Sequence, residues 1–170
     1  MTDLEQRAKR FATERHAEIK QLRKYTGEAY INHPASVVKI VRSAPHTKEM
    51  IAAAWLHDTV EDTSATLDEI ESNFGIEVCQ MVEMLTDISV PEDGNRASRK
   101  AIDREHTAKS TTGAMTIKLA DLIDNSVSIL EHDPRFAKVY IEEKRQLLDV
   151  LKAGDSNLWQ RANDIVSNAL

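Results

Sequence analysis

The chain has few of the residues that shape β-rich or disulfide-stabilised folds. Its 170 residues include five glycines, four prolines and only 5% aromatics. A β-sandwich or barrel needs many turns and β-rich segments, so this composition argues against both. The single cysteine, Cys79, cannot form an intrachain disulfide. It lies among apolar residues and is predicted to be a small core side chain.

The sequence also has no long apolar run and no excess of positive charge. No stretch approaches the roughly 20 apolar residues that span a bilayer. The N-terminal segment is charged throughout and lacks the apolar region of a signal peptide. A cytoplasmic location, with no membrane partner, is therefore expected. The net charge of −6 provides no overall basic field for a nucleic acid polymer. Basic residues gather at 23–24 and 96–109, where they form either solvated helix faces or a local anion site.

What the sequence does contain is helical periodicity. With 41% hydrophobic and 29% charged residues, the chain has the balance of a globular protein. We predict one all-α domain over residues 1–170, a bundle of roughly eight to nine helices. Thr66 and Glu69 form a capping box, Asn32 is the expected N-cap of its helix, and residues 91–95 form a loop. The predicted helices cover about 3–23, 32–42, 47–61, 66–74, 76–88, 97–108, 113–131, 135–152 and 156–169.

The helix predicted over 47–61 is apolar in its middle and carries polar, ionisable side chains at its end. Residues 50–56 are apolar almost all round, which marks a buried central helix. His57 and Glu61, like Asp58 and Asp62, are four residues apart, so each pair stacks on one side of a helix. An apolar helix thus ends in one imidazole and three carboxylates. Burying clustered carboxylates costs roughly several kcal/mol per ion unless basic partners or a cation compensate their charge. Only Lys118 lies close in sequence to these acids, so a divalent cation is the simpler explanation.

Two more places concentrate metal-ligand chemistry. Asp121 and Asn125 repeat the four-residue spacing on a second apolar segment, and His33 precedes Pro34. A mixed His and Asp set suits Mn²⁺, Fe²⁺ or Zn²⁺ better than Ca²⁺. Each residue alone has an ordinary structural explanation, as core histidine, solvated helix end or helix-packing carboxylate. Their combination favours a metal site. The remaining histidines are expected to be surface or capping residues: His16, His46, His106 and His132.

These motifs together resemble a known family. YINHP at 30–34, HDTVEDT at 57–63, LDEI at 67–70 with FG at 74–75, and KLAD at 118–121 with Asn125 are similar to the hydrolase domain of the RelA/SpoT homologues. The resemblance covers about residues 20–145 in unbroken order. It is nearest to the short, hydrolase-only members, the small alarmone hydrolases, and it implies the HD-domain fold.

The resemblance also implies roles for individual residues. His33, His57, Asp58 and Asp121 match the metal ligands, with Mn²⁺ the usual ion. Glu61 and Asp62 match the acidic pair that activates or positions the attacking water. Arg23 matches a residue that packs on the guanine base, and Lys24 is its basic partner. Asn125 matches a contact to the nucleotide sugar, and Tyr140 corresponds to a late helix residue near the substrate.

The expected reaction is hydrolysis of the 3′-pyrophosphate of ppGpp or pppGpp, a small phosphorylated purine nucleotide, to GDP or GTP and pyrophosphate. Asp124 and Ser126 depart from the family pattern, and an extra carboxylate at 124 could alter base preference. Two alternatives stay open. One is another HD phosphohydrolase: an adenine alarmone hydrolase, a nucleotidase or an NADPH phosphatase. The other is a non-catalytic alarmone-binding module, against which the presence of both Glu61 and Asp62 argues.

Overall fold

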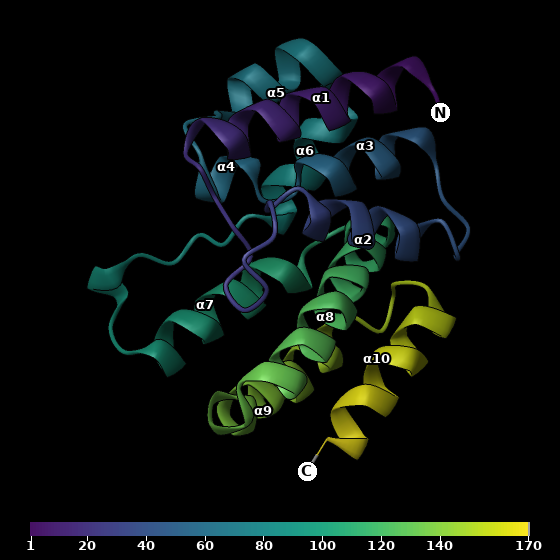
Figure 1. Ribbon diagram of the computed structural model, residues 1–170. Helices are drawn as coiled ribbons and strands as arrows, with labels where there is room; N and C mark the ends of the chain where they lie inside the picture. Colours follow the sequence, from purple (N-terminus) through teal and green to yellow (C-terminus); the bar gives the residue numbers. More distant parts are fainter. Residues whose placement is uncertain (170) are drawn as a thin grey trace. The chain divides into compact units, whose positions relative to one another are not determined.

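The computed structural model describes residues 1–169, which form an all-helical chain (Figure 1). Over these residues there are ten α-helices and one 3₁₀ helix, and the only β-pairing is an isolated bridge between Leu22 and Ala29. The predicted all-α class is confirmed. If the single turn α4 is counted with α3, the number of α-helices is nine, as expected. The contacts divide the chain into two compact units, residues 1–86 and residues 87 onward.

The first unit is built around one buried helix. α3 (Lys48–Leu56) packs against α1, α2 and α6, and every residue from Met50 to Leu56 is buried. Each fully buried Leu, Ile or Trp side chain of this kind contributes about 1.5–3 kcal/mol. The other helices of the unit are α1 (Asp3–Glu18), α2 (Asn32–Val41), α4 (Thr59–Asp62), α5 (Leu67–Phe74) and α6 (Ile76–Leu85).

Side-chain caps fix where several of these helices begin. The Thr47 hydroxyl accepts the Met50 N–H at 3.1 Å and starts α3. The predicted capping box of α5 is confirmed, since Thr66 accepts the Glu69 N–H and Glu69 accepts the Thr66 N–H. The segment predicted as one helix over 47–61 is instead divided at His57–Asp58 into α3 and α4.

Two predicted boundaries near the N-terminus are wrong. The first helix ends at Glu18 rather than near residue 23, because Lys20 adopts φ +52° and the Gln21 N–H turns back to the His16 carbonyl. Asn32 is not the cap of α2 but its first residue; Ile31 holds the cap position without a side-chain bond. The first N–H groups of α2 are satisfied instead by the carbonyls of Ala29 and Tyr30, at 3.1 and 2.9 Å.

The second unit is also entirely helical over its described residues. α8 (Thr112–His132) packs against α9 (Pro134–Val150) and α10 (Ser156–Asn168), and α9 also contacts α7 (Arg96–Ala108). The predicted 91–95 loop contains the 3₁₀ helix η1 (Pro91–Asp93). Gly154 is required because a Cβ there would lie 2.8 Å from Leu119 Cδ1.

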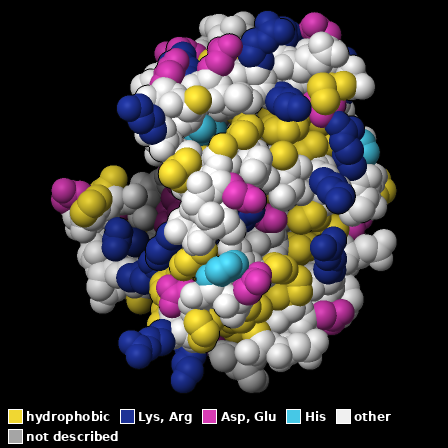
Figure 2. Space-filling view, viewed as in Figure 1, with side chains coloured by type: hydrophobic (Ala, Val, Ile, Leu, Met, Phe, Trp, Pro, Cys, Tyr) yellow, Lys and Arg dark blue, Asp and Glu magenta, His cyan; other side chains and the backbone are white. Residues whose placement is uncertain are grey.

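The helix predicted to reach residue 88 ends three residues earlier, at Leu85. The backbone beyond it is held by Asp103 of α7, whose carboxylate accepts the N–H groups of Ile88 and Ser89 at 3.0 and 2.9 Å. Among the described residues, no helix has the length and apolar character needed to span a membrane. On the face shown in Figure 2, basic and acidic side chains are interspersed, in keeping with the net charge of −6.

Candidate metal centre

Three of the predicted ligands lie together in the first unit. His33 stands in the first turn of α2, whereas His57 and Asp58 form the junction between α3 and α4. One ligand atom from each residue can be chosen so that all three lie within 4.8 Å of one another. Asp58 Oδ2 is 3.1 Å from His57 Nε2 and 3.6 Å from His33 Nε2. Both histidines are only 2% exposed, so two imidazoles and one carboxylate converge at a largely buried point.

The hydrogen bonds around the cluster orient its donor atoms. His57 Nδ1 lies 2.7 Å from the Ala54 carbonyl, which can only accept a hydrogen bond. The His57 proton therefore sits on Nδ1, and the Nε2 lone pair faces the cluster. The Tyr30 hydroxyl donates to Asp58 Oδ2 at 2.5 Å and holds that carboxylate in place. Two nitrogen donors and one carboxylate oxygen, oriented in this way, fit a divalent transition metal ion.

The acidic pair follows one turn later, on α4. Glu61 and Asp62 are both solvent-exposed, in contrast to the histidines. The Gln21 side-chain amide donates to Asp62 Oδ2 at 3.0 Å. Although Asp62 is exposed, neighbouring groups remove part of the hydration of its carboxyl, which raises its pKa; the Gln21 hydrogen bond opposes this shift and the Asp58 charge adds to it. A carboxylate with a raised pKa is a better proton acceptor near neutral pH than an ordinary aspartate.

The fourth predicted ligand belongs to the second unit. Asp121 lies on α8, is 9% exposed and forms an ion pair with Lys118 at 3.5 Å. Asn125, one turn later, donates to Asp121 Oδ1 at 2.8 Å. Tyr140 on α9 is buried, and its hydroxyl lies 3.3 Å from Ser126 Oγ. Burial raises the pKa of the Tyr140 hydroxyl, so it stays protonated. The roles of these residues as ligand or substrate contacts stay predictions.

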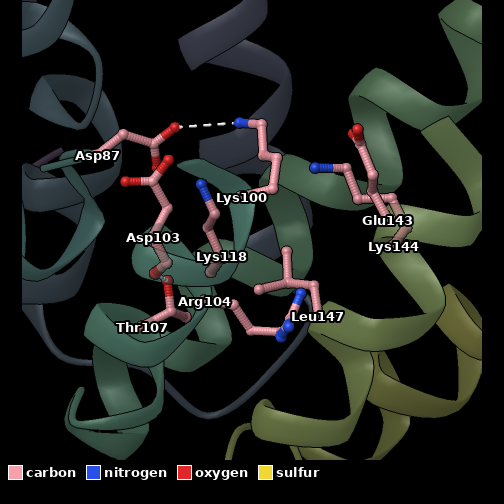
Figure 3. Close-up of a pocket in the computed structure, with 9 residues that line it drawn as sticks. All are labelled: Asp87, Lys100, Asp103, Arg104, Thr107, Lys118, Glu143, Lys144 and Leu147. Atoms are coloured by element: carbon pink, nitrogen blue, oxygen red, sulfur yellow. Dashed lines mark hydrogen bonds and ion pairs between the residues drawn. The ribbon is translucent and has the colours of Figure 1, made fainter. Parts of the chain in front are cut away.

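The second unit also contains a small cavity of about 40 Å³ whose lining is rich in charge (Figure 3). Lys100, Lys118 and Lys144 present amino groups to it, and Arg104 lies at its edge. Asp87 pairs with Lys100 at 3.3 Å. The other acids are engaged elsewhere: Asp103 caps the 88–89 backbone, and Glu143 binds Arg96 through two contacts at 2.6 and 2.9 Å. Lys118 is likewise paired, with Asp121, so basic and acidic side chains largely balance around the cavity.

The predicted substrate-binding pair lies on a short loop of the first unit. The loop is closed by the Leu22–Ala29 bridge and by the Arg23 N–H, which donates to the Glu28 carbonyl at 2.8 Å. Gly27 has φ +72°, a conformation that few other residues adopt without strain. Lys24 Nζ lies 5.0 Å from the Tyr25 ring centroid. The loop therefore presents Arg23 and Lys24 from an ordered turn.

The sequence did not reveal three side chains that support the cluster. Tyr30 and Gln21 bind the carboxylates of Asp58 and Asp62. Tyr30 opens the YINHP motif but was given no role of its own, and no residue pattern marks Gln21. His16, predicted to be a surface or capping residue, is only 2% exposed, and this prediction is wrong. It is buried because α1 ends there and the chain reverses, so that the Tyr30 ring packs over it with centroids 4.7 Å apart. His46 and His132 are exposed, as expected.

The fold and the cluster together define an all-helical protein with a His and Asp cluster that could hold a metal ion. A family model described as HD domain matches residues 8–150, and the chain belongs to this family. The curated proteins that it resembles include the human and fruit-fly (Drosophila melanogaster) forms of guanosine-3′,5′-bis(diphosphate) 3′-pyrophosphohydrolase MESH1. The human protein is 38% identical over 117 residues, covering 68% of this chain and 63% of that protein. The fruit-fly protein is 32% identical over 143 residues, covering 80% and 78%.

A solved structure gives the same relationship. The chain resembles a protein described as a metazoan ortholog of SpoT that hydrolyses ppGpp, with a TM-score of 0.87 and 28% identity over 99% of this chain and 96% of that one. The predicted resemblance to the RelA/SpoT hydrolase domain is confirmed. The chain aligns with less than two thirds of the human protein's length.

Proposed function

We propose that this protein removes the 3′-pyrophosphate of ppGpp or pppGpp, giving GDP or GTP and pyrophosphate, in the cytoplasm. The observation that carries the proposal is the buried His33, His57 and Asp58 cluster in an HD-family chain. The relatives with this reaction in their names support the choice of substrate. We further propose that residues 1–170 act as one catalytic domain, because the family match extends from residue 8 to residue 150.

In this proposal the cluster and Asp121 hold one divalent ion, and Mn²⁺ is the ion we expect. Oxygen from carboxylates and nitrogen from imidazoles are donors that Mn²⁺ accepts readily. A bound divalent ion supplies Lewis-acid polarisation of a phosphate oxygen and acidifies a water. Tyr30 and the Ala54 carbonyl keep Asp58 and His57 in fixed orientations, so the ligands need little reorganisation.

The chain's own residues then handle the proton and the substrate. Glu61 and Asp62 orient the attacking water, and Asp62, with its raised pKa, accepts a proton from it. Arg23 covers one face of the guanine base and Lys24 meets phosphate charge. Asn125 contacts the sugar, and Tyr140 lies near the nucleotide. Neutralising phosphate charge with basic groups is most of what this reaction requires from the protein.

Metal content and hydrolysis rate, measured on the same variants, test these assignments. His57→Ala and Asp121→Ala should lose both the bound ion and the activity, because removing one ligand typically lowers metal affinity by at least about 10–100-fold. Glu61→Gln and Asp62→Asn should keep the ion and nucleotide binding but lose about 10²-fold in kcat. His132→Ala, at an exposed helix end, is the matched control and should change neither quantity.

Three results would each contradict one of these assignments. A wild-type protein that carries no Mn, Fe, Zn, Co or Ni and is active in the presence of a chelator would contradict the metal centre. Near wild-type turnover in both Glu61→Gln and Asp62→Asn would mean that the acidic pair is only a solvated helix end. Retained metal in Asp121→Ala would remove that residue from the ligand set.

A further inference from the structure

His16 is a buried imidazole that the proposed reaction leaves unused. It stands in the last turn of α1 and is 2% exposed, although no predicted role calls for an imidazole there. Its Nδ1 lies 2.7 Å from Gln21 Oε1, and the Gln21 Nε2 amide donates to Asp62 Oδ2 at 3.0 Å. A continuous chain of two hydrogen bonds therefore leads from a buried histidine to a carboxylate of the acidic pair.

The direction of this chain follows from elementary hydrogen-bond chemistry. An ionised carboxylate only accepts hydrogen bonds, so the Gln21 amide must turn its NH₂ group toward Asp62. Its oxygen then faces His16, and an amide oxygen also only accepts. The imidazole must therefore carry its proton on Nδ1. The Asp62 carboxylate thus sets the orientation of the Gln21 amide, and this amide sets the tautomer of His16.

Burial supports the same tautomer. Loss of hydration lowers the pKa of His16, with the Gln21 hydrogen bond opposing this shift, so the ring is neutral at pH 7. A neutral imidazole has one N–H and one bare nitrogen. His16 Nε2 is buried and has no hydrogen-bond partner among the described residues, which suits the bare nitrogen, since a buried N–H without an acceptor costs more.

The backbone holds the two ends of this chain together. The Gln21 N–H donates to the His16 carbonyl at 3.1 Å, and the Lys20 N–H donates to the Ala17 carbonyl at 2.9 Å. These two bonds are the Schellman arrangement, with Lys20 at φ +52° in the position that usually holds glycine. The way α1 ends thus places the backbone of Gln21 beside His16.

We propose that His16 and Gln21 are positioning residues for Asp62, holding its carboxylate in the orientation that the attacking water requires. The proposal rests on the hydrolytic function given above. Gln21 supplies the contact to the carboxylate, and His16 prevents the amide from rotating about its final bond. Asp62 is exposed, so without this support its side chain would sample several orientations.

Steady-state kinetics on two removal variants and one conservative variant test the proposal. His16→Phe and Gln21→Met keep the volume but delete the hydrogen bonds, and each should lower kcat about tenfold while KM changes less than about twofold. His16→Asn keeps an N–H near the place of Nδ1 and should recover most of the loss. Gln6→Met, on the exposed face of the same helix, is the matched control and should behave as wild type.

A double-mutant comparison separates positioning from a general loss of structure. In an Asp62→Asn background, Gln21→Met should cause no further loss of kcat beyond about twofold, because the group that it positions no longer acts as a carboxylate. Metal content should stay at the wild-type level in every variant. An equal fold-loss in both backgrounds, or wild-type kcat in His16→Phe, would overturn the proposal.

The tautomer of His16 provides a readout that does not depend on turnover. Nitrogen-15 NMR of the metal-loaded wild type should show the proton on Nδ1, and Gln21→Met should weaken that preference. A proton found on Nε2 would mean that the hydrogen-bond chain does not exist. If the wild type does not hydrolyse ppGpp, the proposed function fails, whereas the tautomer still decides whether the chain from His16 to Asp62 is formed.

Discussion

The carboxylates of the candidate centre do not depend on the metal alone for their orientation. Asp58 accepts the Tyr30 hydroxyl, and Asp62 accepts the Gln21 amide. Both donors come from the segment between α1 and α2, and both contact the ring of His16 or its nitrogen. A single segment therefore supports the predicted ligand and the predicted base together, which is how supporting side chains preorganise a site.

A second residue with unusual ionisation is Lys144 on α9. Burial lowers its pKa from an ordinary 10.5 to about 8, and the charge of Lys118 adds to this effect. Its amino group lies 4.8 Å from the Tyr140 ring centroid, a contact that favours the charged form and offsets part of the burial cost. The lysine lines the charged cavity of the second unit.

This shift predicts a pH-dependent stability. Below pH 8 the folded protein holds a charge that burial disfavours, so Lys144→Met should raise the free energy of unfolding by about 1–3 kcal/mol at pH 7. As pH rises from about 8 to 10.5, Lys144 loses its proton in the folded protein before it does so in the unfolded chain. The free energy of unfolding of the wild type therefore rises over this range and approaches that of Lys144→Met. Denaturant unfolding of both proteins at pH 7 and pH 10.5 measures the effect. If the two proteins differed in unfolding free energy by the same amount at both pH values, the prediction would be wrong.

At the scale of elements, the decisive feature is how α1 ends. Three more residues of helix would carry Gln21 around the axis and away from His16, because successive residues turn by about 100°. The left-handed Lys20 prevents this and reverses the chain. A lysine in that conformation costs about 1 kcal/mol relative to glycine, since its Cβ crowds the backbone.

Lys20→Gly should therefore stabilise the protein by about 0.5–1 kcal/mol without changing kcat. Thermal unfolding of the metal-free protein measures the first quantity, and steady-state hydrolysis measures the second. Arg10→Gly, at an exposed position in the interior of α1, is the opposite control and should destabilise by a similar amount. A loss of stability in Lys20→Gly would mean that the observed helix end is not the preferred one.

The same helix end shows why the sequence predicted most elements but not all of them. Local signals with a clear chemistry, such as the Thr66 capping box and the apolar run of α3, gave correct elements. Lys20 carries no such signal, because lysine is a good helix former. Backbone hydrogen bonds to His16 and Ala17, together with the pairing of Leu22 with Ala29, hold the left-handed turn. The supporting roles of Tyr30, Gln21 and His16 depend on that pairing and could not be read locally.

At the scale of the whole molecule, the predicted ligands are far apart in the chain. Three of them, His33, His57 and Asp58, form a cluster in the first unit, as the motifs predicted. Asp121 lies in the second unit, where Lys118 and Asn125 bind its carboxylate. The apolar segments before His57 and Asp121 were sufficient to predict that these two side chains are buried, and their role as ligands stays a prediction. The partners of Asp121 could not be ranked from the sequence, because several polar residues share its helix.

The products that the protein releases from its substrate test the proposed reaction most directly. Purified wild type should be incubated with Mn²⁺ and ppGpp, and separately with pppGpp, an adenine analogue and NADPH. Products are then separated by anion exchange and identified by phosphorus-31 NMR. We predict GDP from ppGpp and GTP from pppGpp, each with an equal amount of intact pyrophosphate. Release of orthophosphate, or turnover only of the adenine compounds, would contradict the proposed removal of the 3′-pyrophosphate from ppGpp and pppGpp.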